Sequence, residues 1–225
     1  TGGEKLGIEV HLAFYQFTSN DDVNNTTFLG IKTFNRSDNN YHAFRTGIWM
    51  DADIGLATND YVGCDSNRSA VYFYNCYNTD NDYGNFPPAY GFTFLSEPLS
   101  SFMYHNIGGS PNGDPNNALD FFNYMNSTWQ NGQHLLYGGN GFNNGTTGAN
   151  SNFTFTGNPY LQTGWNEVNE GNPTGDRRGV GFTDSTVFYA YDPKCLDVAF
   201  IFNNSLDYAF HNANYLFCPT TSITY

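Results

Sequence analysis

The sequence predicts an all-β protein, β-sandwich or jelly-roll-like, with one short α-helix near residues 115–131. Three observations support this fold class: many short runs of strand-forming residues, turn residues between them, and a high aromatic content. The 225 residues include 21 Phe, 17 Tyr, 32 Asn and 24 Gly, and only 13% are charged. Disordered chains show the opposite balance. We expect residues 1–225 to form a single β-rich domain, cut from a longer secreted protein.

The strand pattern is clearest near the N-terminus. Residues 7–18 place Ile8, Val10, Leu12 and Phe14 at every second position, which is the period of a β-strand. Other runs are rich in Phe, Tyr, Val, Ile or Thr and are bounded by Asn, Asp, Gly or Pro. They predict strands at 27–34, 42–50, 70–77, 89–95, 100–106, 152–156, 179–183, 186–191 and 196–203. Many short strands of this kind favour a sandwich or barrel.

One segment has the pattern of a helix instead. Asp114 suits an N-cap, Pro115 suits the first helical position, and Gly132 suits the end of the helix. The intervening residues predict an apolar face made of Ala118, Phe121 or Phe122, Met125 and Trp129.

The charge of the chain excludes several kinds of partner. Its net charge is −13, and it contains only three lysines. Such a chain repels phosphate backbones and anionic lipid, so we expect no nucleic-acid partner. It has no apolar run of about 18 residues, so we expect no direct membrane insertion. The same charge favours divalent cations.

Four cysteines indicate an oxidising compartment. Four allow three pairings, and we expect the two local ones, Cys64–Cys76 and Cys195–Cys218. Each would stabilise the fold by roughly 3 kcal/mol on the loop-entropy view. No C-x-x-C pair occurs, which argues against zinc. The cysteines therefore favour an extracellular or cell-surface location.

Residues 51–65, DADIGLATNDYVGCD, contain four aspartates. Calcium binds six to eight oxygens from carboxylates, amides and backbone carbonyls. The stretch is not an EF-hand, because Gly55 stands where a third ligand belongs. A solvated acidic loop and a catalytic carboxylate pair are the alternatives. We expect a structural Ca²⁺ site with the ligands Asp51, Asp53, Asn59, Asp60 and Asp65.

No pattern in the sequence indicates catalysis. Only five glutamates exist, and Glu9 has no evident carboxylate partner for glycoside hydrolysis. There is no G-x-S-x-G motif, and the five histidines are scattered. We therefore expect a protein that is not an enzyme. Its aromatics suggest carbohydrate binding as an alternative, with sugar-stacking candidates at Tyr72, Tyr74, Tyr77, Trp129 and Trp165.

The segment Gly175-Asp176-Arg177-Arg178 is distinctive because basic residues are rare here. In a strand, Arg177 and Arg178 point to opposite faces. One of them can pair with a carboxylate, either Asp176 or an aspartate of residues 51–65. We interpret Asp176, Arg177 and Arg178 as a structural latch, with a clamp for a ligand carboxylate as the alternative.

Several segments together resemble the extracellular module of proteins exported by the Bacteroidetes type IX secretion system. They occur in family order and cover most of residues 1–180. Where the family usually reads D-P-D-L-G, this chain has Asp51-Ala52-Asp53-Ile54-Gly55, and after Arg178 it departs from the family pattern. The matching stretches are TGGEKLGIEVHLAFYQFTSNDDVNNTTF, IWMDADIGLATNDYVGCD, GNFPPAYGFTF, DPNNALDFFNYMNSTWQNG followed by YGGNGF, and GDRR.

The resemblance implies a location more than an activity. It implies a cell-surface or secreted domain in adhesion, surface assembly or a filament, with self-assembly or a surface polysaccharide as partner. It assigns no catalytic residue. It also implies O-glycosylation within Asp184-Ser185-Thr186, which makes Ser185 the candidate acceptor. A carbohydrate-binding module of a secreted enzyme remains the alternative.

Overall fold

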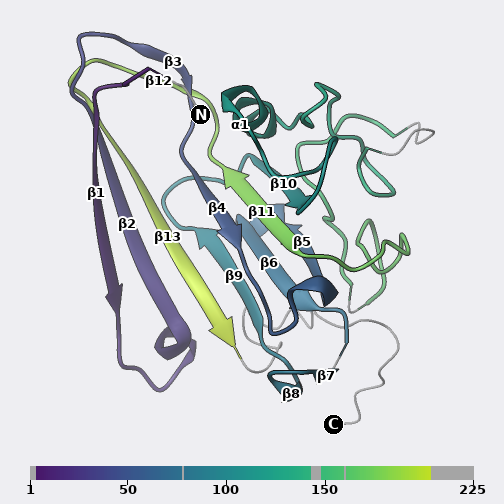
Figure 1. Ribbon diagram of the computed structural model, residues 1–225. Helices are drawn as coiled ribbons and strands as arrows, with labels where there is room; N and C mark the ends of the chain where they lie inside the picture. The colour runs from purple at the N-terminus through teal and green to yellow at the C-terminus, as the bar shows by residue number, and fades with distance from the viewer. Residues whose placement is uncertain (1–3, 78, 143–147, 160, 204–225) are drawn as a thin grey trace.

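The computed structural model describes residues 4–77, 79–142, 148–159 and 161–203 (Figure 1). It confirms the all-β class, since strands dominate and a single α-helix occurs within these ranges. The strands are β1 (Ile8–Gln16), β2 (Thr26–Asn35), β3 (Tyr41–Phe44), β4 (Gly47–Asp51), β5 (Asp60–Asp65), β6 (Ala70–Asn75), β7 (Thr79–Asp80), β8 (Gly84–Asn85), β9 (Ala89–Phe94), β10 (Ser101–Asn106), β11 (Arg177–Phe182), β12 (Thr186–Phe188) and β13 (Pro193–Asn203).

The strands form two main antiparallel sheets. The larger has six strands in the order β1-β2-β13-β9-β6-β5, and the smaller has the order β10-β11-β4. Two further two-stranded sheets are formed by β12 with β3 and by β7 with β8. Among the described residues, three short 3-10 helices lie in the connections between strands: η1 (Asp22–Asn25) between β1 and β2, η2 (Ala57–Asn59) between β4 and β5, and η3 (Ser66–Arg68) between β5 and β6. This strand order does not by itself establish the expected sandwich or jelly roll.

The core lies where the smaller sheet faces β9, β6 and β5. Phe73 and Phe92 of the larger sheet and Phe102 and Val180 of the smaller one are completely buried in one cluster. Gly179 permits their close approach, because a Cβ there would lie 2.8 Å from Phe102 and 2.9 Å from Phe73. The glycines of β11 are therefore a packing requirement.

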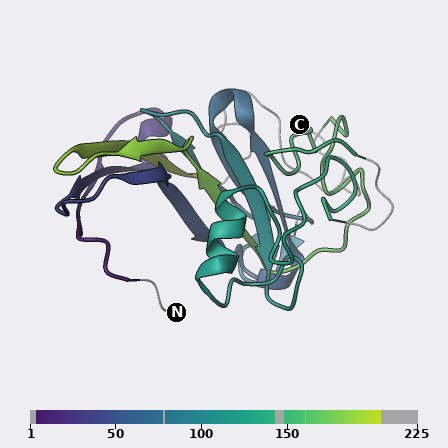
Figure 2. The ribbon, with the colours of Figure 1, turned by 90° about the horizontal axis from the view of Figure 1, so that it is seen from above.

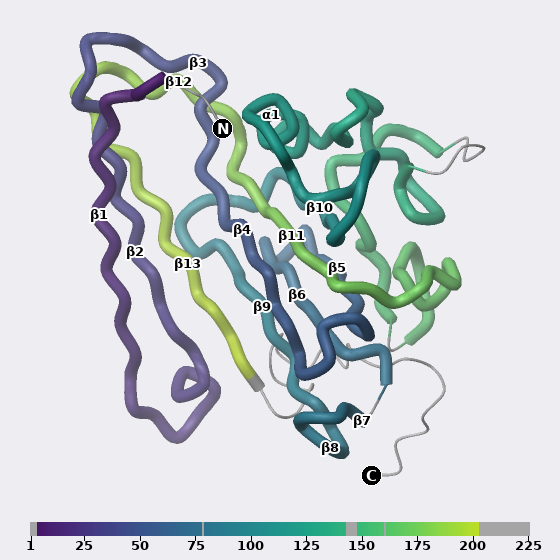
Figure 3. Tube along the Cα trace, in the orientation of Figure 1, coloured from purple at the N-terminus to yellow at the C-terminus, as the bar shows by residue number. Residues whose placement is uncertain are grey.

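The larger sheet extends beyond the smaller one. Strands β1 and β2 lie at the far side of β13 from the smaller sheet, as two views show (Figures 1 and 2). Seven consecutive residues of β1, 10–16, are exposed. The tube trace shows β3 and β12 curling over one end of these strands (Figure 3). One part of the sheet is thus in the core, and another part is a projecting edge.

The helix is shorter than the sequence predicted. Helix α1 spans Ala118–Met125, and Asn117, not Asp114, caps it by accepting from the N–H groups of Leu119 and Asp120. Asp114 instead forms ion pairs elsewhere. The expected apolar face was also wrong at its centre: Phe121 and Phe122 are exposed, whereas Tyr124 is buried. Among the described residues, no helix is long and apolar enough to cross a membrane.

Three segments differ from the predicted strand pattern. Residues 60–65 were treated as part of an acidic loop, but they form β5, whose first five residues are buried. Residues 152–156 were predicted as a strand, but only an isolated bridge joins Phe153 to Phe102. The region 42–50 divides into β3 and β4.

Both expected disulfides are wrong, since Cys64 and Cys195 are free thiols. The hairpin register explains the first error: Cys64 lies opposite Val71, whereas Cys76 follows β6 and bonds to the backbone of Asn59. About five residues of strand, on the order of 16 Å, separate them, and a disulfide needs Cα atoms within about 7 Å. Cys76 is not a free thiol. Cys218 lies outside the described residues.

Candidate functional site

Three carboxylates gather where β4 ends and β11 begins. Asp51 closes β4 and Asp53 follows it, while Asp176 immediately precedes β11. The two strands are antiparallel neighbours with Asp51 opposite Arg178, so their register carries Asp176 toward Asp53. One carboxylate oxygen from each of the three lies within 4.8 Å of the others. We call Asp51, Asp53 and Asp176 the acidic cluster.

Arg178 neutralises part of this charge. Its Nε lies 2.7 Å from Asp51 Oδ2, its Nη1 2.7 Å from Asp114 Oδ2, and its Nη2 3.2 Å from Asp176 Oδ2. The guanidinium of Arg178 therefore forms ion pairs with three carboxylates. Asp53 forms no ion pair within the described ranges, so the cluster keeps an excess of negative charge.

Asp60 adds a buried carboxyl behind the cluster. Its Oδ2 accepts from the Ile54 N–H at 3.2 Å, but its Oδ1 is buried without a hydrogen-bond partner. Burial is the main cause that raises its pKa to about 8; the nearby charges of Asp53, Asp80 and Asp176 contribute to this rise, and the hydrogen bond from Ile54 opposes it. Asp176 Oδ1 is also buried and unpartnered, and burial raises the pKa of that carboxyl too.

Asp80 binds the loop between β4 and β5, which contains Asp53 of the acidic cluster. It accepts from the N–H groups of Leu56, Asp82 and Tyr83 at 2.8–3.1 Å. Burial opposes ionisation of Asp80, but these hydrogen bonds outweigh it and lower its pKa. Asn59 also bonds to Asp80 through its side chain, and its own Oδ1 is buried without a partner.

The structure brings together some of the predicted metal ligands and separates one. Asp51 and Asp53 are in the cluster, and Asp60 interacts electrostatically with Asp53. Asp65 lies at the other end of β5, about 16 Å from Asp60 by strand length. There it caps η3 and pairs with Arg68 Nη1 at 2.5 Å. It cannot bind an ion held by the cluster.

Asp176 was predicted as part of a latch and not as a ligand. Arg178 does pair with Asp51 and Asp176, and Arg177 points the other way. Arg177 Nη2 lies 2.5 Å from Glu167 Oε2, inside the protein. Sequence reasoning missed Asp80, Asp114 and Glu167, because only tertiary pairing brings them to this region.

A histidine adjoins the cluster from β10. His105 Nδ1 lies 2.8 Å from Asp114 Oδ1, and its Nε2 is buried without a partner. The ring packs against Trp49 and Tyr124. Burial lowers the pKa of His105 to about 4, although Asp114 acts in the opposite direction. His105 is thus a neutral packed side chain at physiological pH.

The aromatic residues considered for sugar stacking are mostly inaccessible. Tyr72, Tyr74, Trp129 and Trp165 are each at most 1% exposed, so they belong to the core. Tyr77 alone is exposed among these candidates. Ser185, the candidate glycosylation site, is also exposed, between β11 and β12. Its modification stays a prediction.

No protein-family model matches this sequence, and no curated protein matches it.

Proposed function

We propose that the protein is a non-catalytic structural or adhesion domain of an extracellular surface, stabilised by Ca²⁺ at the acidic cluster. The observation that carries the proposal is the unbalanced charge there: Asp51, Asp53 and Asp176 converge, with the unpartnered Oδ1 of Asp60 buried behind them. Carboxylate oxygens of this kind are the ligands that hard divalent cations such as Ca²⁺ prefer.

The surroundings of the cluster supply further oxygen atoms. Asp51, Asp114 and Asp176 share the single positive charge of Arg178. Asp53 lies close to Asp51 and Asp176, and the carboxyl group of Asp60 interacts with Asp53 and Asp176. Burial is the largest cause of the raised pKa of Asp60, and a cation bound by Asp53 and Asp176 would offset the smaller contribution of their charges. It would also fix the end of β4 against the start of β11.

The placement of the other charged pairs supports a structural role. The His105–Asp114 and Arg177–Glu167 pairs have the chemistry of acid–base groups, but His105 is 1% exposed and Glu167 is completely buried. A substrate in solution has no direct access to His105 or Glu167, whereas Asp114 is partly exposed. Both pairs join loops to sheets, which is what a stable extracellular scaffold requires.

Calcium titration of the melting temperature tests the metal site. We expect Ca²⁺ to raise the melting temperature of the wild type and EDTA to lower it. Asp53→Asn should abolish this response, because Asp53 is the cluster member without an arginine partner. Glu97→Gln, at an exposed carboxylate, and Asp65→Asn, at the distant end of β5, should retain it. An unchanged wild-type melting temperature, with no calcium retained in equilibrium dialysis, would overturn the site.

A polar cavity favours glycan binding as the second candidate function. The cavity has a volume of about 300 Å³ and lies beside the start of β10. Arg45 in its wall is the one arginine that forms no ion pair within the described residues. The buried hydroxyl of Ser101 also lacks a partner. Asp184, Asn126 and Asn152 add acceptors and donors suited to sugar hydroxyls.

A polysaccharide-binding assay separates this candidate from the first. Isothermal titration with soluble oligosaccharides should show binding that Arg45→Ala weakens at least tenfold. Arg36→Ala provides a control, since Arg36 is exposed and pairs with Glu9 far from the cavity. If Arg45→Ala and Arg36→Ala bind equally well, the cavity is not the site.

A further inference from the structure

Strand β1 is the free edge of the six-stranded sheet. Its nine residues pair with β2 in an unbroken antiparallel register, from Ile8↔Asn35 to Gln16↔Thr27. No strand within the described ranges pairs with its other side. That side therefore presents a row of backbone N–H and C=O groups, which is a template for another strand.

The side chains of β1 make this edge apolar. Val10, Leu12 and Phe14 occupy one face, and they are 53%, 56% and 64% exposed. The same face of the sheet continues through β2 to Leu196 and Val198 of β13, which are completely covered. An apolar surface that starts in the core thus runs out to an uncovered edge.

Natural edge strands usually carry protection against pairing, and β1 carries little. Proline, lysine and bulges are the common devices, but the strand reads IEVHLAFYQ and its register has no bulge. Its one acidic residue, Glu9, is paired with Arg36 Nε at 2.8 Å. These properties leave β1 open to pairing with a further strand.

We propose that β1 pairs antiparallel with β1 of a second copy of this chain, across a two-fold axis at Leu12, to make one continuous sheet. This inference rests on the proposed role in a surface assembly and names the partner. Pairing of identical strands across a two-fold axis buries the same patch on both copies. It also satisfies the free edge groups of both β1 strands.

The sequence of β1 is complementary to itself in this register. Leu12 faces its own copy, and Val10 faces Phe14 of the second copy, so apolar side chains meet on one face. On the other face, His11 meets Ala13 and Glu9 meets Tyr15. No like charges lie directly opposite each other, which would otherwise destabilise the pair.

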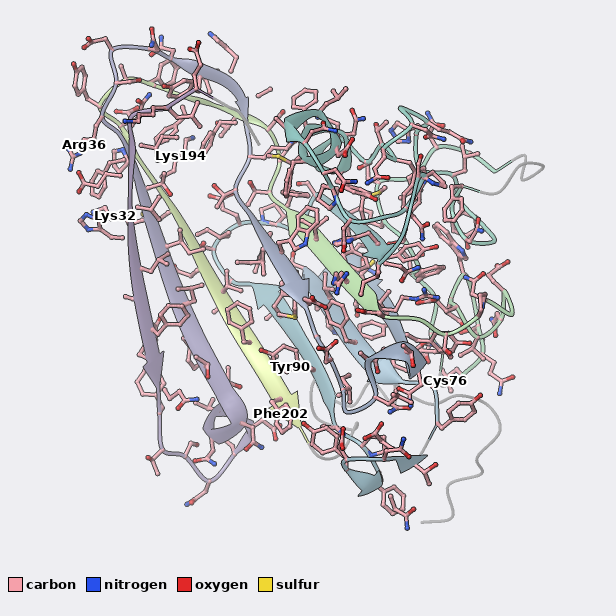
Figure 4. All side chains as sticks on the ribbon, in the orientation of Figure 1. Lys32, Arg36, Cys76, Tyr90, Lys194 and Phe202 are labelled. Atoms are coloured by element: carbon pink, nitrogen blue, oxygen red, sulfur yellow. The ribbon has the colours of Figure 1, made fainter. Side chains whose placement is uncertain are left out.

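Net charge opposes association only weakly in this part of the chain. Residues 4–46 and 183–203 contain five of the eight basic residues and eight of the 21 acidic ones, so they carry −3 of the total charge of −13. Lys32, Arg36 and Lys194 gather near one end of β1 and β2 (Figure 4). Asp21 and Asp22 follow the opposite end of β1. Arg36 is already paired with Glu9. Antiparallel pairing sets Lys32 and Lys194 of each copy toward Asp21 and Asp22 of the other, which are of opposite charge.

Cysteine cross-linking of the full chain tests the pairing and its register. Directly opposed residues in an antiparallel pair have Cα atoms about 4.5–5.5 Å apart, within disulfide range. In a Cys195→Ser background, which removes the exposed free thiol found among the described residues, Leu12→Cys should form a covalent dimer on mild oxidation. Val10→Cys should not, since Val10 and its copy are four residues out of register. The background chain without an added cysteine should also stay uncross-linked.

Light scattering provides the second measurement. We expect the wild type to be a dimer, and Leu12→Lys to raise the dissociation constant at least tenfold by opposing two ammonium groups. Leu119→Lys, at a leucine of α1 that is 63% exposed against 56% for Leu12, should leave the dimer unchanged. Circular dichroism spectra identical to the wild type would show that both variants fold.

Two outcomes would overturn the proposal. One is a monomeric wild type at all concentrations, which would leave the edge for a different protein or another segment. The other is cross-linking of Val10→Cys as efficient as that of Leu12→Cys, which would indicate random collision. Calcium binding has its own readout in the melting temperature, so a failure of the metal site and a failure of this interface are distinguishable.

Discussion

Arg177 and Glu167 form a buried ion pair, with Arg177 Nη2 2.5 Å from Glu167 Oε2 and Nε within 3.1 Å of both carboxylate oxygens. Glu167 also accepts from the Val62 N–H at 2.9 Å, and Arg177 donates to Asn106 Oδ1 at 2.7 Å. One pair thus joins the long loop before β11 to β5 and β10. Burial raises the pKa of the Glu167 carboxyl despite the arginine.

Glu167→Gln should lower the free energy of unfolding by about 3–5 kcal/mol, because it leaves the charge of Arg177 buried without a counter-ion. Urea unfolding followed by tryptophan fluorescence measures the change. Glu9→Gln provides the matched control, since it breaks the exposed pair with Arg36 and should have little effect. Equal effects of the two substitutions would contradict the structural importance of the buried pair.

The sequence predicted the fold class because strand patterns are local, and it failed where tertiary contacts decide. Residues 60–65 looked like an acidic loop, yet β5 forms because Tyr61, Val62 and Cys64 are buried against neighbouring strands. The helix begins late because Asp114 is engaged by Arg178 and His105, which leaves capping to Asn117. His105 and Arg178 lie nine and 64 residues from Asp114, beyond the span of a helix-capping pattern.

Gly55 should not tolerate a side chain. Its φ is +69°, and a Cβ would lie 1.8 Å from Asp80 Oδ1. Gly55→Ala should therefore cost about 1–2 kcal/mol for the backbone conformation and a further 1–3 kcal/mol for the overlap. Gly84→Ala is a close control, because Gly84 has the same φ of +69° with no atom within 4 Å of its Cβ position. Thermal unfolding of both variants isolates the overlap, and equal costs would show that Asp80 moves aside freely.

Only the part of the candidate site that is local in the sequence could be predicted, because tertiary contacts decide the rest. Asp51 and Asp53 are neighbours in sequence, so their proximity is a local property. Asp176 reaches them only through the pairing of β4 with β11, and Asp65 is removed from them by the length of β5. A sequence window cannot distinguish an aspartate at one end of a strand from one at the other unless the strand itself is recognised.

The two free thiols should differ strongly in reactivity. Cys195 is exposed, whereas Cys64 is 1% exposed and its Sγ lies 3.2 Å from the Thr154 carbonyl. Burial raises the pKa of the Cys64 thiol, and the thiolate is the reactive form. We expect iodoacetamide to label Cys195 in the native protein and Cys64 only in denaturant, as peptide mass spectrometry would show. Cys195→Ser should remove the native labelling at that position; rapid native labelling of Cys64 would contradict its burial.

The stability of the protein should fall as the pH falls from about 6.5 to about 4, in part because of His105. Burial lowers the folded-state pKa of this residue to about 4, against 6.5 for the free side chain. Between these values the unfolded state binds a proton that the folded state does not, so protonation favours unfolding. The buried Nε2 also has no acceptor for an added proton. The loss attributable to His105 is on the order of 2–3 kcal/mol.

Urea unfolding at several pH values, with a His105→Gln variant, measures this contribution. Glutamine does not titrate, so the variant should lose less stability than the wild type between pH 6.5 and 4. His42→Gln is the control, since His42 is exposed on β3 and should leave the pH dependence unchanged. If His105→Gln and the wild type lose the same stability over this range, the histidine is protonated in the folded protein, and Asp114 compensates its burial.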